Sequence, residues 1–577
     1  MHFPTRRNRL IRHALLATSI LAAAPALAAE VTPDRLANPD KEPQNWLMNH
    51  RTYDGQRFSP LARINRDTVR NLRLAYSVAL GGSAGNEWAE ATPLAEDGFL
   101  YVTDSWGVLY KIDGTSGDKG RIVWRMDPKQ QRQVNNRGAA FWGNLVITPA
   151  NDPARIVATD KDTGKVVWET NVVFDEPLVQ ITGAVLPIKD KIIVGASGGD
   201  RGARAWVGAL DAATGKLVWL KHTIPAPGEP GSETWKGNDA WRTGGGAVWV
   251  TGTYDPPTNQ TIWGVGNPVP MMDPSARPGD NLFTNSAVSY DPETGKMNWY
   301  FQYTPNDGWD FDEVGTHVLI DGQIAGETRK LITHSARNGF LYTMERNTGQ
   351  IVVAKPYMDK INWTRGIDQK TGKPLDYDPS RDVQLCAGVA TPTRDEPVKR
   401  LCPTRTGGNN YWPSSYSPRT KLLYIAAMTA CEDVTNDRQL AERGKEQGWF
   451  TRTGGGYRAP ERYGSTLTAI DPFTGEIRKN LNLHYPNYSG TLSTAGGLVF
   501  LALMDGTVAA YDDTTLEELW KVNVGSGFSA PPMTFEHAGR QYVAIVSGPS
   551  NGAKTKLINT PELKEQRDAM VLYVFGL

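Results

Sequence analysis

Three carboxylates and two large aromatic side chains are concentrated in the stretch GWDFDEVG, residues 308–315. Asp310, Asp312 and Glu313 repel one another at neutral pH, and the repulsion grows as their surroundings become drier. A solvated turn would relieve this repulsion. A cation held by the carboxylate oxygens would also relieve it, and one carboxylate could then act as a base. The rest of the chain has to decide between these two readings.

The composition of the chain narrows the classes of partner. The formal net charge is +0 and the pI is near 7.1, so there is no electrostatic reason to expect nucleic acid or an anionic membrane as a partner. The 58 Gly, 38 Pro and 18 Trp are spread along 577 residues without a linker-like block. This distribution favours one large β architecture that binds a small or neutral partner.

The first 28 residues have the pattern of a secretory signal. Four arginines precede an apolar run that starts at Ala14 and ends in the small-residue motif Ala26-Leu27-Ala28. We therefore expect a mature domain, residues 29–577, in the periplasm. No later segment has about 18 consecutive apolar residues, so we expect no membrane anchor.

Cysteine and histidine usage limits the metal and haem chemistry of the chain. Cys386, Cys402 and Cys431 are the three cysteines, which allows at most one internal disulfide bond. No Cys-x-x-Cys-His motif occurs, which excludes covalently attached haem in this chain. No His-x-x-x-His pair occurs among the eight histidines, which argues against a zinc site.

A repeated segment of the form apolar-Asp-x-x-Thr-Gly-Lys-apolar-x-Trp organises the chain. Each of its seven recognisable copies follows a short alternating β run and contains Asp, Asn or Thr-Gly turn residues, so each predicts a hairpin. Spacings of roughly 40 to 80 residues predict a β-propeller with seven or eight blades. We expect the recurring tryptophans to pack between neighbouring blades: Trp124, Trp168, Trp219, Trp299 and Trp520.

Two stretches, residues 354–402 and 429–462, lack the repeat and are rich in charged residues and proline. They predict insertions on one face of the ring, with a separate domain as the alternative. Glycine-rich stretches interrupt several strands, and these indicate either close approach of the backbone to a ligand or tight packing between blades. They are residues 195–204, 242–249, 264–270 and 524–532.

The short motifs of the chain, taken in order, resemble those of the quinoprotein alcohol dehydrogenases. The set is EATPL, NRGAA, ITGA, SGGDRG, GGGAVW, GNPVP, WDFD, ARNG and NNYWP, and it runs through essentially the whole mature sequence. The family's members are all-β, eight-bladed propellers with tryptophan-docking repeats, and they use pyrroloquinoline quinone (PQQ) and a metal ion. The resemblance therefore implies this fold and these cofactors for the chain.

The resemblance also assigns roles to individual residues. It makes Asp310 the catalytic base and Asn267 a metal ligand, and it places Asp200 where the family usually has a metal-binding glutamate. The quinone would stack on Trp249. Arginine, hydroxyl and amide groups around it suit a planar polyanion. The implied cofactor contacts are Glu90, Arg137, Thr182, Ser197, Gly198, Gly199, Arg337 and Asn410.

Asp312 bears on the identity of the metal. It lies two residues beyond Asp310, on the same side if the segment is extended, where it could add an oxygen ligand. Members of the family with Asp-x-Asp are associated with lanthanide ions. Asp200, Asp310 and Asp312 supply three negative charges, which favours a lanthanide(III) ion over Ca²⁺. We expect Glu313 to lie behind the ligands or to face solvent, and Trp309 to pack.

Three departures from the family's pattern concern the surroundings of the site. Gln131 and Arg132 occupy the places of two adjacent cysteines that often form a small disulfide ring over the quinone. Met271 and Met272 follow GNP where methanol-oxidising members bring in a tryptophan, which favours a substrate larger than methanol. Cys402 and Cys431 match the family's other disulfide, which would leave Cys386 free or alternatively paired.

Together these features predict a periplasmic enzyme that oxidises a small alcohol to an aldehyde by hydride transfer to metal-bound PQQ. Without haem, a soluble cytochrome c would take the electrons. The sequence does not decide between a monomer and a homodimer. Ser197 also satisfies Gly-x-Ser-x-Gly, but no helix follows it as a hydrolase requires. The remaining alternative is a non-catalytic propeller scaffold that binds peptides.

Overall fold

A computed structural model gives the arrangement of the chain, and the description covers most of it. The described residues are 1–2, 29–81, 88–237, 239–324, 326–384, 391–393, 395–437, 454–460, 462–550, 553 and 560–577. Most of the predicted signal segment and Cys386 lie outside these ranges. No described helix has the length and apolarity needed to cross a membrane.

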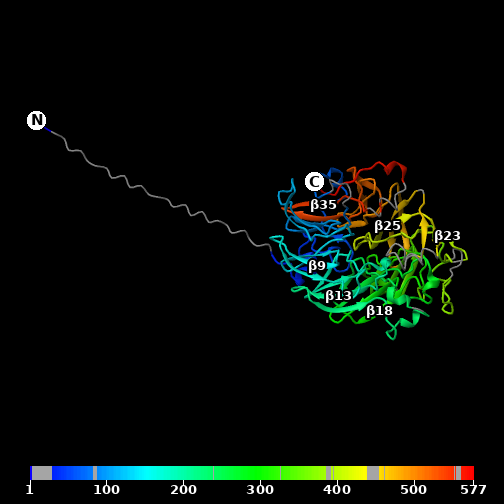
Figure 1. The fold of residues 1–577 in the computed structure, drawn as a ribbon. Coiled ribbons are helices and arrows are strands. Elements are labelled where there is room, and N and C mark those ends of the chain that lie inside the picture. Colours follow the sequence, from blue (N-terminus) through cyan, green and yellow to red (C-terminus); the bar gives the residue numbers. More distant parts are fainter. Residues whose placement is uncertain are drawn as a thin grey trace.

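The described residues form eight sheets of four or five strands and one sheet of three strands. Each large sheet is built mainly from strands consecutive in the sequence, paired antiparallel, and the sheets follow one another around a common centre (Figure 1). The expected all-β fold is confirmed. The sheets agree with a propeller, while the number of blades stays a prediction.

The strand bounds are as follows, sheet by sheet. The first three sheets contain β3 Leu94–Glu96, β4 Phe99–Thr103, β5 Leu109–Asp113 and β6 Arg121–Met126; β7 Ala140–Trp142, β8 Leu145–Ala150, β9 Arg155–Asp160 and β10 Val166–Asn171; β11 Leu186–Ile188, β12 Lys191–Gly195, β13 Trp206–Asp211 and β14 Leu217–His222. The next three contain β15 Thr253–Asp255, β16 Gln260–Val265, β17 Ser286–Tyr290 and β18 Met297–Gln302; β19 Val318–Ile324, β20 Glu327–Ser335, β21 Phe340–Glu345 and β22 Ile351–Pro356; β24 Ser415–Ser417, β25 Leu422–Thr429, β28 Gly464–Asp471 and β29 Glu476–Leu483. The last two contain β1 Phe58–Ser59, β30 Thr491–Thr494, β31 Leu498–Ala502, β32 Thr507–Asp512 and β33 Glu518–Asn523; β2 Arg73–Ala79, β34 Met533–His537, β35 Arg540–Val546 and β36 Val571–Gly576.

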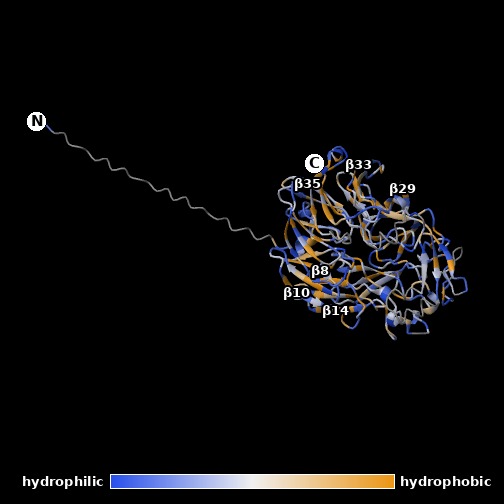
Figure 2. Cartoon of the chain, turned by 45° about the horizontal axis from the view of Figure 1, so that its top comes forward, coloured by the Kyte–Doolittle hydropathy of each residue, from blue (hydrophilic) through white to orange (hydrophobic). Residues whose placement is uncertain are grey.

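Helical structure in the described part is limited to short segments that connect strands. They are α1 Pro33–Ala37 and the 3₁₀ turns η1 Pro39–Lys41, η2 Val69–Asn71, η3 Gly199–Arg201, η4 Ser232–Thr234, η5 Ala240–Thr243, η6 Pro274–Ala276 and η9 Pro561–Leu563. Strands such as β8 are hydrophobic and buried, whereas the connecting loops are more hydrophilic (Figure 2). The core therefore lies within and between the sheets.

The two ends of the domain close the ring together. β2, near the N-terminus, pairs antiparallel with β36, the last strand, and completes the sheet of β34 and β35. β1 adds to β30 in parallel. Blue and red segments accordingly lie side by side in Figure 1. This closure leaves fewer strand edges open to other chains.

The repeated tryptophans join each sheet to the next, as predicted. The indole Nε1 of Trp168 donates to Ala212 O at 3.2 Å, and that of Trp219 donates to Pro292 O at 2.9 Å. The Thr-Gly of the following repeat lies against the indole: a Cβ at Gly295, where φ is +68°, would be 2.5 Å from Trp219. Trp124 and Trp520 make equivalent contacts through Nε1. Trp299 instead donates to Gln260 Oε1 within its own sheet and meets the next repeat through Gly349, where a Cβ would lie 2.7 Å from the indole. Packing between sheets thus explains both the Trp and the Gly of the repeat.

Replacing Trp219 with Ala should destabilise the fold by about 3–5 kcal/mol, since the indole is 8% exposed and its hydrogen bond would also be lost. Urea unfolding measures this loss of stability, and we expect a lower midpoint for Trp219→Ala than for the parent protein. Val218→Ala is the matched control, because this neighbour on the outer face of β14 is 46% exposed, and we expect a change within about 0.5 kcal/mol. Equal effects of the two substitutions would contradict the docking role.

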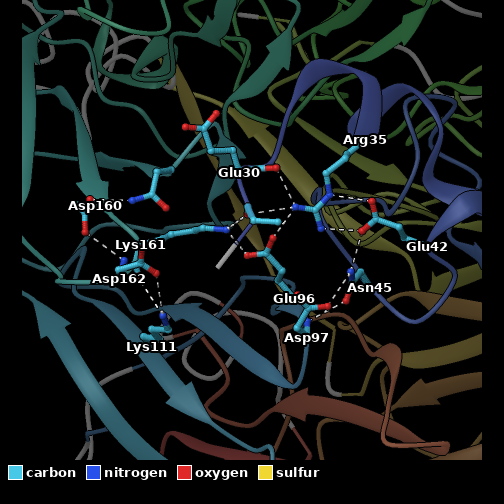
Figure 3. A network of polar contacts seen from close by, with 12 residues as sticks. Glu30, Arg35, Glu42, Asn45, Glu96, Asp97, Lys111, Asp160, Lys161 and Asp162 are labelled. Carbon is cyan, nitrogen blue, oxygen red and sulfur yellow. Dashed lines mark hydrogen bonds and ion pairs between the residues drawn. The ribbon is translucent and has the colours of Figure 1, made fainter. Parts of the chain in front are cut away.

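A buried ionic network ties the start of the domain to the ring (Figure 3). Arg35 in α1 bonds Glu42 at 2.6 Å and Glu96 in β3 at 2.7 Å. Lys161, which is fully buried, reaches Glu96 at 2.6 Å and also donates to Ala29 O at 2.5 Å. Because every charged partner is compensated, the segment from residue 29 is fixed against β3 and the turn after β9.

Strands from both predicted insertions form a small sheet. β23 Val398–Leu401, β26 Glu432–Asn436 and β27 Gly455–Arg458 pair antiparallel and belong to none of the eight large sheets. A disulfide bond joins Cys402 to Cys431 at the ends of β23 and β26, which confirms the pairing that the resemblance implied. The two stretches thus supply strands outside the large sheets, while their place on one face of the ring stays a prediction.

Candidate functional site

A cavity of about 500 Å³ contains most of the residues predicted for the site. Its wall is built from loops of several sheets, at positions from 90 to 553. Every predicted cofactor contact and three of the four predicted metal ligands line it. The lining residues are Glu90, Arg132, Gln133, Val134, Asn135, Arg137, Gln180, Thr182, Ser197, Gly198, Gly199, Asp200, Arg201, Ala247, Trp249, Asp310, Asp312, Arg337, Arg405, Thr406, Asn410, Tyr411, Tyr488, Ser550 and Ala553.

The indole of Trp249 forms a flat part of this wall, and two guanidinium groups lie over its ring. The loop between η5 and β15 carries it, and Thr182 Oγ1 donates to its carbonyl oxygen at 3.2 Å. The Cζ atoms of Arg137 and Arg337 lie 4.6 Å and 5.9 Å from its ring centroid. Arg137 is held by Glu90 at 2.8 Å. The side chains provide an aromatic face with cations beside it.

Small and polar groups complete the wall near this face. Ser197 Oγ donates to Gln180 O at 2.9 Å, and Asn410 Nδ2 donates to Thr406 O at 2.8 Å. Gly198 has φ of +99°, and a Cβ there would lie 2.4 Å from Leu178 O. Close approach of protein backbone therefore accounts for this glycine without any ligand.

The three carboxylates of residues 308–315 have different partners, and these partners reduce the repulsion expected from their close spacing. Asp310 Oδ2 lies 3.6 Å from Arg405 Nη1, and Asp312 Oδ2 lies 3.3 Å from Arg337 Nη2. Glu313 is fully buried and bonds His334 Nε2 at 3.2 Å and the backbone N–H of Arg337 at 2.8 Å. Protein cations and amides thus offset much of the charge.

The structure decides two open points about this stretch. The segment is not extended, because Asp310 has φ of +64°, which turns the chain. Of the two places expected for Glu313, the one behind the cavity is correct, since the buried Glu313 carboxylate accepts from the backbone N–H of Arg337. Trp309 packs as expected, 1% exposed and 5.5 Å from the ring of Trp363.

Asn267 connects two of the predicted metal-binding carboxylates. Its backbone N–H donates to Asp312 Oδ1 at 2.8 Å, and its side chain hydrogen-bonds Asp200. The position of Asp312 also explains Gly266, the first residue of the motif GNPVP, since a Cβ at Gly266 would lie 2.0 Å from Asp312 Oδ1. Asn267 itself is buried behind the cavity wall. The predicted set is therefore adjacent, although Asn267 does not line the cavity.

The carboxylates are electrostatically coupled. Burial raises the pKa of Asp310 well above its usual value, and the negative charge of Asp200 raises it further, while Arg337 and Arg405 act in the opposite direction. Asp200 is exposed on the cavity wall, but the protein around its carboxyl group displaces water. This desolvation raises the pKa of Asp200 to about 6, and the negative charge of Asp312 raises it further. Concentrated negative charge of this kind is stabilised by a cation.

The residues present fit an oxygen-ligated cation. Asp310 Oδ1 is buried and accepts no hydrogen bond from the described residues, so one hard oxygen donor is left without a partner. Within the same ranges, no three His, Cys, Asp or Glu side chains form a ready cluster for a metal. Both oxygens of Asp312 have partners in the protein, so its Arg337 contact would have to give way for direct ligation.

Met271 and Met272 do not line the cavity, although the sequence placed them where related enzymes bring in a tryptophan. Met271 and Met272 are 7% and 2% exposed, pack together with Val269, and are not part of the described cavity wall. They therefore give no indication of substrate size. Arg132, in the place of one missing cysteine, lines the cavity and pairs with Asp152 at 2.9 Å.

Sequence reasoning missed several aromatic and cationic residues of the wall. Tyr411 carries the guanidinium of Arg137 on its ring at 4.6 Å, Tyr488 lies against Tyr411 with centroids 5.5 Å apart, and Arg405 faces Asp310. Tyr411 lies within NNYWP, so that motif was the available signal. Arg405 lies outside every motif that carried the resemblance.

Comparison with known proteins decides the family. A model of the PQQ-dependent glucose, ethanol and alcohol dehydrogenase β-propeller domain matches residues 46–355 and 461–543. The chain belongs to this family. Quinoprotein alcohol dehydrogenase PedH of Pseudomonas putida is 33% identical over 94% of the chain and 93% of its own length. The lanthanide-dependent methanol dehydrogenase of Methylorubrum extorquens is 33% identical over 94% and 92%.

Solved structures agree with this membership in the PQQ dehydrogenase family. Quinohemoprotein alcohol dehydrogenase ADHIIG of Pseudomonas putida superposes with a TM-score of 0.86 at 31% identity, covering 95% of the chain and 82% of that protein. A europium-containing methanol dehydrogenase gives 0.83 at 29% identity, covering 94% and 100%. The propeller prediction and the family resemblance are both confirmed.

Proposed function

We propose that this protein oxidises an alcohol to an aldehyde, with PQQ as the hydride acceptor and a bound metal ion in the same cavity. The observation that carries the proposal is Asp310, whose buried Oδ1 lacks a partner among the described residues and which shares a cavity with the face of Trp249. A base beside a flat stacking surface is the arrangement that alcohol oxidation by a quinone requires.

The chain offers a complete set of contacts for the quinone. Trp249 provides the stacking face, Arg137 and Arg337 provide positive charge for carboxylates and quinone oxygens, and Glu90 orients Arg137. Thr182, Ser197, Gly198, Gly199 and Asn410 would hold the ring edge. When bound, PQQ supplies the two-electron acceptor that no amino-acid side chain provides.

Asp200, Asn267, Asp310 and Asp312 would hold the metal. Three carboxylates favour a lanthanide(III) ion over Ca²⁺, and relatives named for lanthanide and europium content support that preference. Asp310 would accept the hydroxyl proton of the alcohol. Arg337 donates to the carbonyl oxygen of Asp310 at 2.6 Å and so fixes the backbone of the base.

The setting of the enzyme follows from the sequence. Residues 1–28 would be removed on export, and residues 29–577 would act in the periplasm as the catalytic domain. A soluble cytochrome c would accept the electrons, because this chain has no haem-attachment motif. A homodimer and a monomer are both compatible with this function.

Reconstitution tests the proposal directly. The purified protein is mixed with PQQ and either Ca²⁺ or a light lanthanide(III) ion, and its absorption spectrum and dye reduction with primary alcohols are measured. We expect a quinone spectrum and alcohol-dependent dye reduction that both require PQQ and metal. Silence under every combination, in a protein that is folded by circular dichroism, would instead favour the non-catalytic scaffold.

A further inference from the structure

Arg405 is held beside Asp310 by the small sheet of β23, β26 and β27 rather than by any large sheet. It follows β23, and its side chain is 17% exposed. Its guanidinium Cζ lies 3.4 Å from the ring centroid of Tyr457 in β27, and its backbone N–H donates to Glu432 in β26. The neighbouring Cys402–Cys431 disulfide joins the same strands. The small sheet therefore fixes where this cation points.

The donors of this guanidinium are largely unused. Its nearest carboxylate oxygens are Asp310 Oδ2 at 3.6 Å and Glu432 Oε1 at 3.9 Å, both beyond ordinary hydrogen-bond length. In the described part of the chain, its Nε is buried without a hydrogen-bond partner. Arg337, by contrast, donates to Asp310 O at 2.6 Å. Arg405 thus presents to the cavity donors that suit an anionic acceptor.

The place of Arg405 separates it from the proposed quinone contacts. Arg137 and Arg337 flank the ring of Trp249, whereas Arg405 stacks on Tyr457 and faces the carboxylate of Asp310. An alcohol with its hydroxyl on Asp310 would bring the substituents of its carbinol carbon close to Arg405. A carboxylate attached to the carbinol carbon could then be bound by the planar fork of the guanidinium.

We propose that Arg405 is a specificity-determining residue which binds a carboxylate attached directly to the carbinol carbon, so that 2-hydroxy acids are preferred substrates. This inference rests on the proposed alcohol oxidation. The hydroxyl proton of the substrate passes to Asp310 and the carbinol hydride to the quinone, which leaves a 2-oxo acid. The carboxylate itself is not altered, and Arg405 only positions it.

The test compares glycolate with glycolamide, which has the same shape but carries no charge. Both are assayed by dye reduction with the PQQ- and metal-loaded protein, at fixed ionic strength and saturating metal. We expect kcat/KM to be at least about 10-fold higher for glycolate. In Arg405→Gln the ratio of the two kcat/KM values should fall about 10- to 100-fold, because a charge-assisted contact is lost. Arg405→Lys should recover part of it.

Inhibition by acetate gives a second readout that does not depend on oxidation of an acid. With ethanol as substrate, acetate should compete in the parent protein and compete at least about 10-fold less well in Arg405→Gln. A parent that prefers glycolamide, or an unchanged ratio in Arg405→Gln, would overturn the inference. Equal losses for glycolate and glycolamide, together with a weaker quinone spectrum, would also overturn it by placing Arg405 on the cofactor.

These outcomes are distinct from failure of the proposed function. If the reconstituted parent oxidises no alcohol at all, neutral or anionic, the alcohol oxidation itself is wrong. If it oxidises ethanol and glycolamide while discriminating against glycolate, the alcohol oxidation holds and only the role of Arg405 is lost.

Discussion

Asp310→Asn should lower kcat of the PQQ- and metal-loaded protein by at least about 100-fold, and by up to about 10⁴-fold. The amide has the size of the carboxyl group but cannot accept the hydroxyl proton. The fold should be retained, because Asn tolerates the φ of +64° that this position adopts. The measurement is single-turnover and steady-state alcohol oxidation, with the thermal unfolding midpoint as the check on folding.

The same substitution removes a proposed metal ligand, so loss of metal has to be separated from loss of the base. Bound metal is measured by mass spectrometry and the metal is titrated to saturation. Turnover that stays low at full metal occupancy identifies Asp310 as the base. Recovery to parent turnover at high metal would show that it acts only as a ligand. Asp34→Asn, on a side chain 77% exposed, is the control for an Asp-to-Asn change.

The sheets could be predicted because their signal is local and repeated. Each copy of the Thr-Gly…Trp segment contains both halves of one contact: the indole packs on the glycine of the next copy, as Trp219 does on Gly295. Such a repeat needs no knowledge of the distant chain. Trp249 and Asp310 were located differently, through the resemblance of the short motifs GGGAVW and WDFD to those of the family.

The arrangement within the cavity could not be predicted from spacing. The carboxylates of Asp312 and Glu313 are one residue apart, yet one pairs with the Arg337 side chain and the other accepts from the Arg337 backbone. The turn at Asp310 and the close fit of Gly266 set that divergence. The fit of Gly266 against Asp312 depends on packing of segments more than 40 residues apart, which period-2 and period-3.6 patterns do not report.

The place of Arg405 was even harder to predict from local sequence patterns. It approaches Asp310 from 95 positions further along the chain, out of the connection that follows β23. Its orientation depends on Tyr457 and Glu432, which two other strands of the small sheet supply. No local pattern in residues 402–408 distinguishes this arginine from one on the surface. Only the folded structure reveals that it faces the cavity.

Asp312→Ala should impair use of a lanthanide(III) ion much more than use of Ca²⁺. At about 4 Å and an effective dielectric constant near 20, one unit of charge interacts with another by roughly 4 kcal/mol. Removing the Asp312 carboxylate therefore costs a trivalent ion about one such unit more than a divalent ion. Screening reduces the difference, so we expect the ratio of apparent metal affinities to shift by at least about 100-fold.

The side chain of Asp312 also has structural contacts, which the design must separate from its charge. Asp312→Asn keeps an oxygen that can accept from Asn267 N–H but removes the negative charge, whereas Asp312→Ala removes both. If charge selects the metal, both variants lose lanthanide affinity in titrations followed by dye reduction. If only Asp312→Ala loses affinity, the contact with Asn267 matters rather than charge. Full lanthanide-dependent activity in both variants would remove the reason for preferring a trivalent ion, since Asp200 and Asp310 alone match a divalent one.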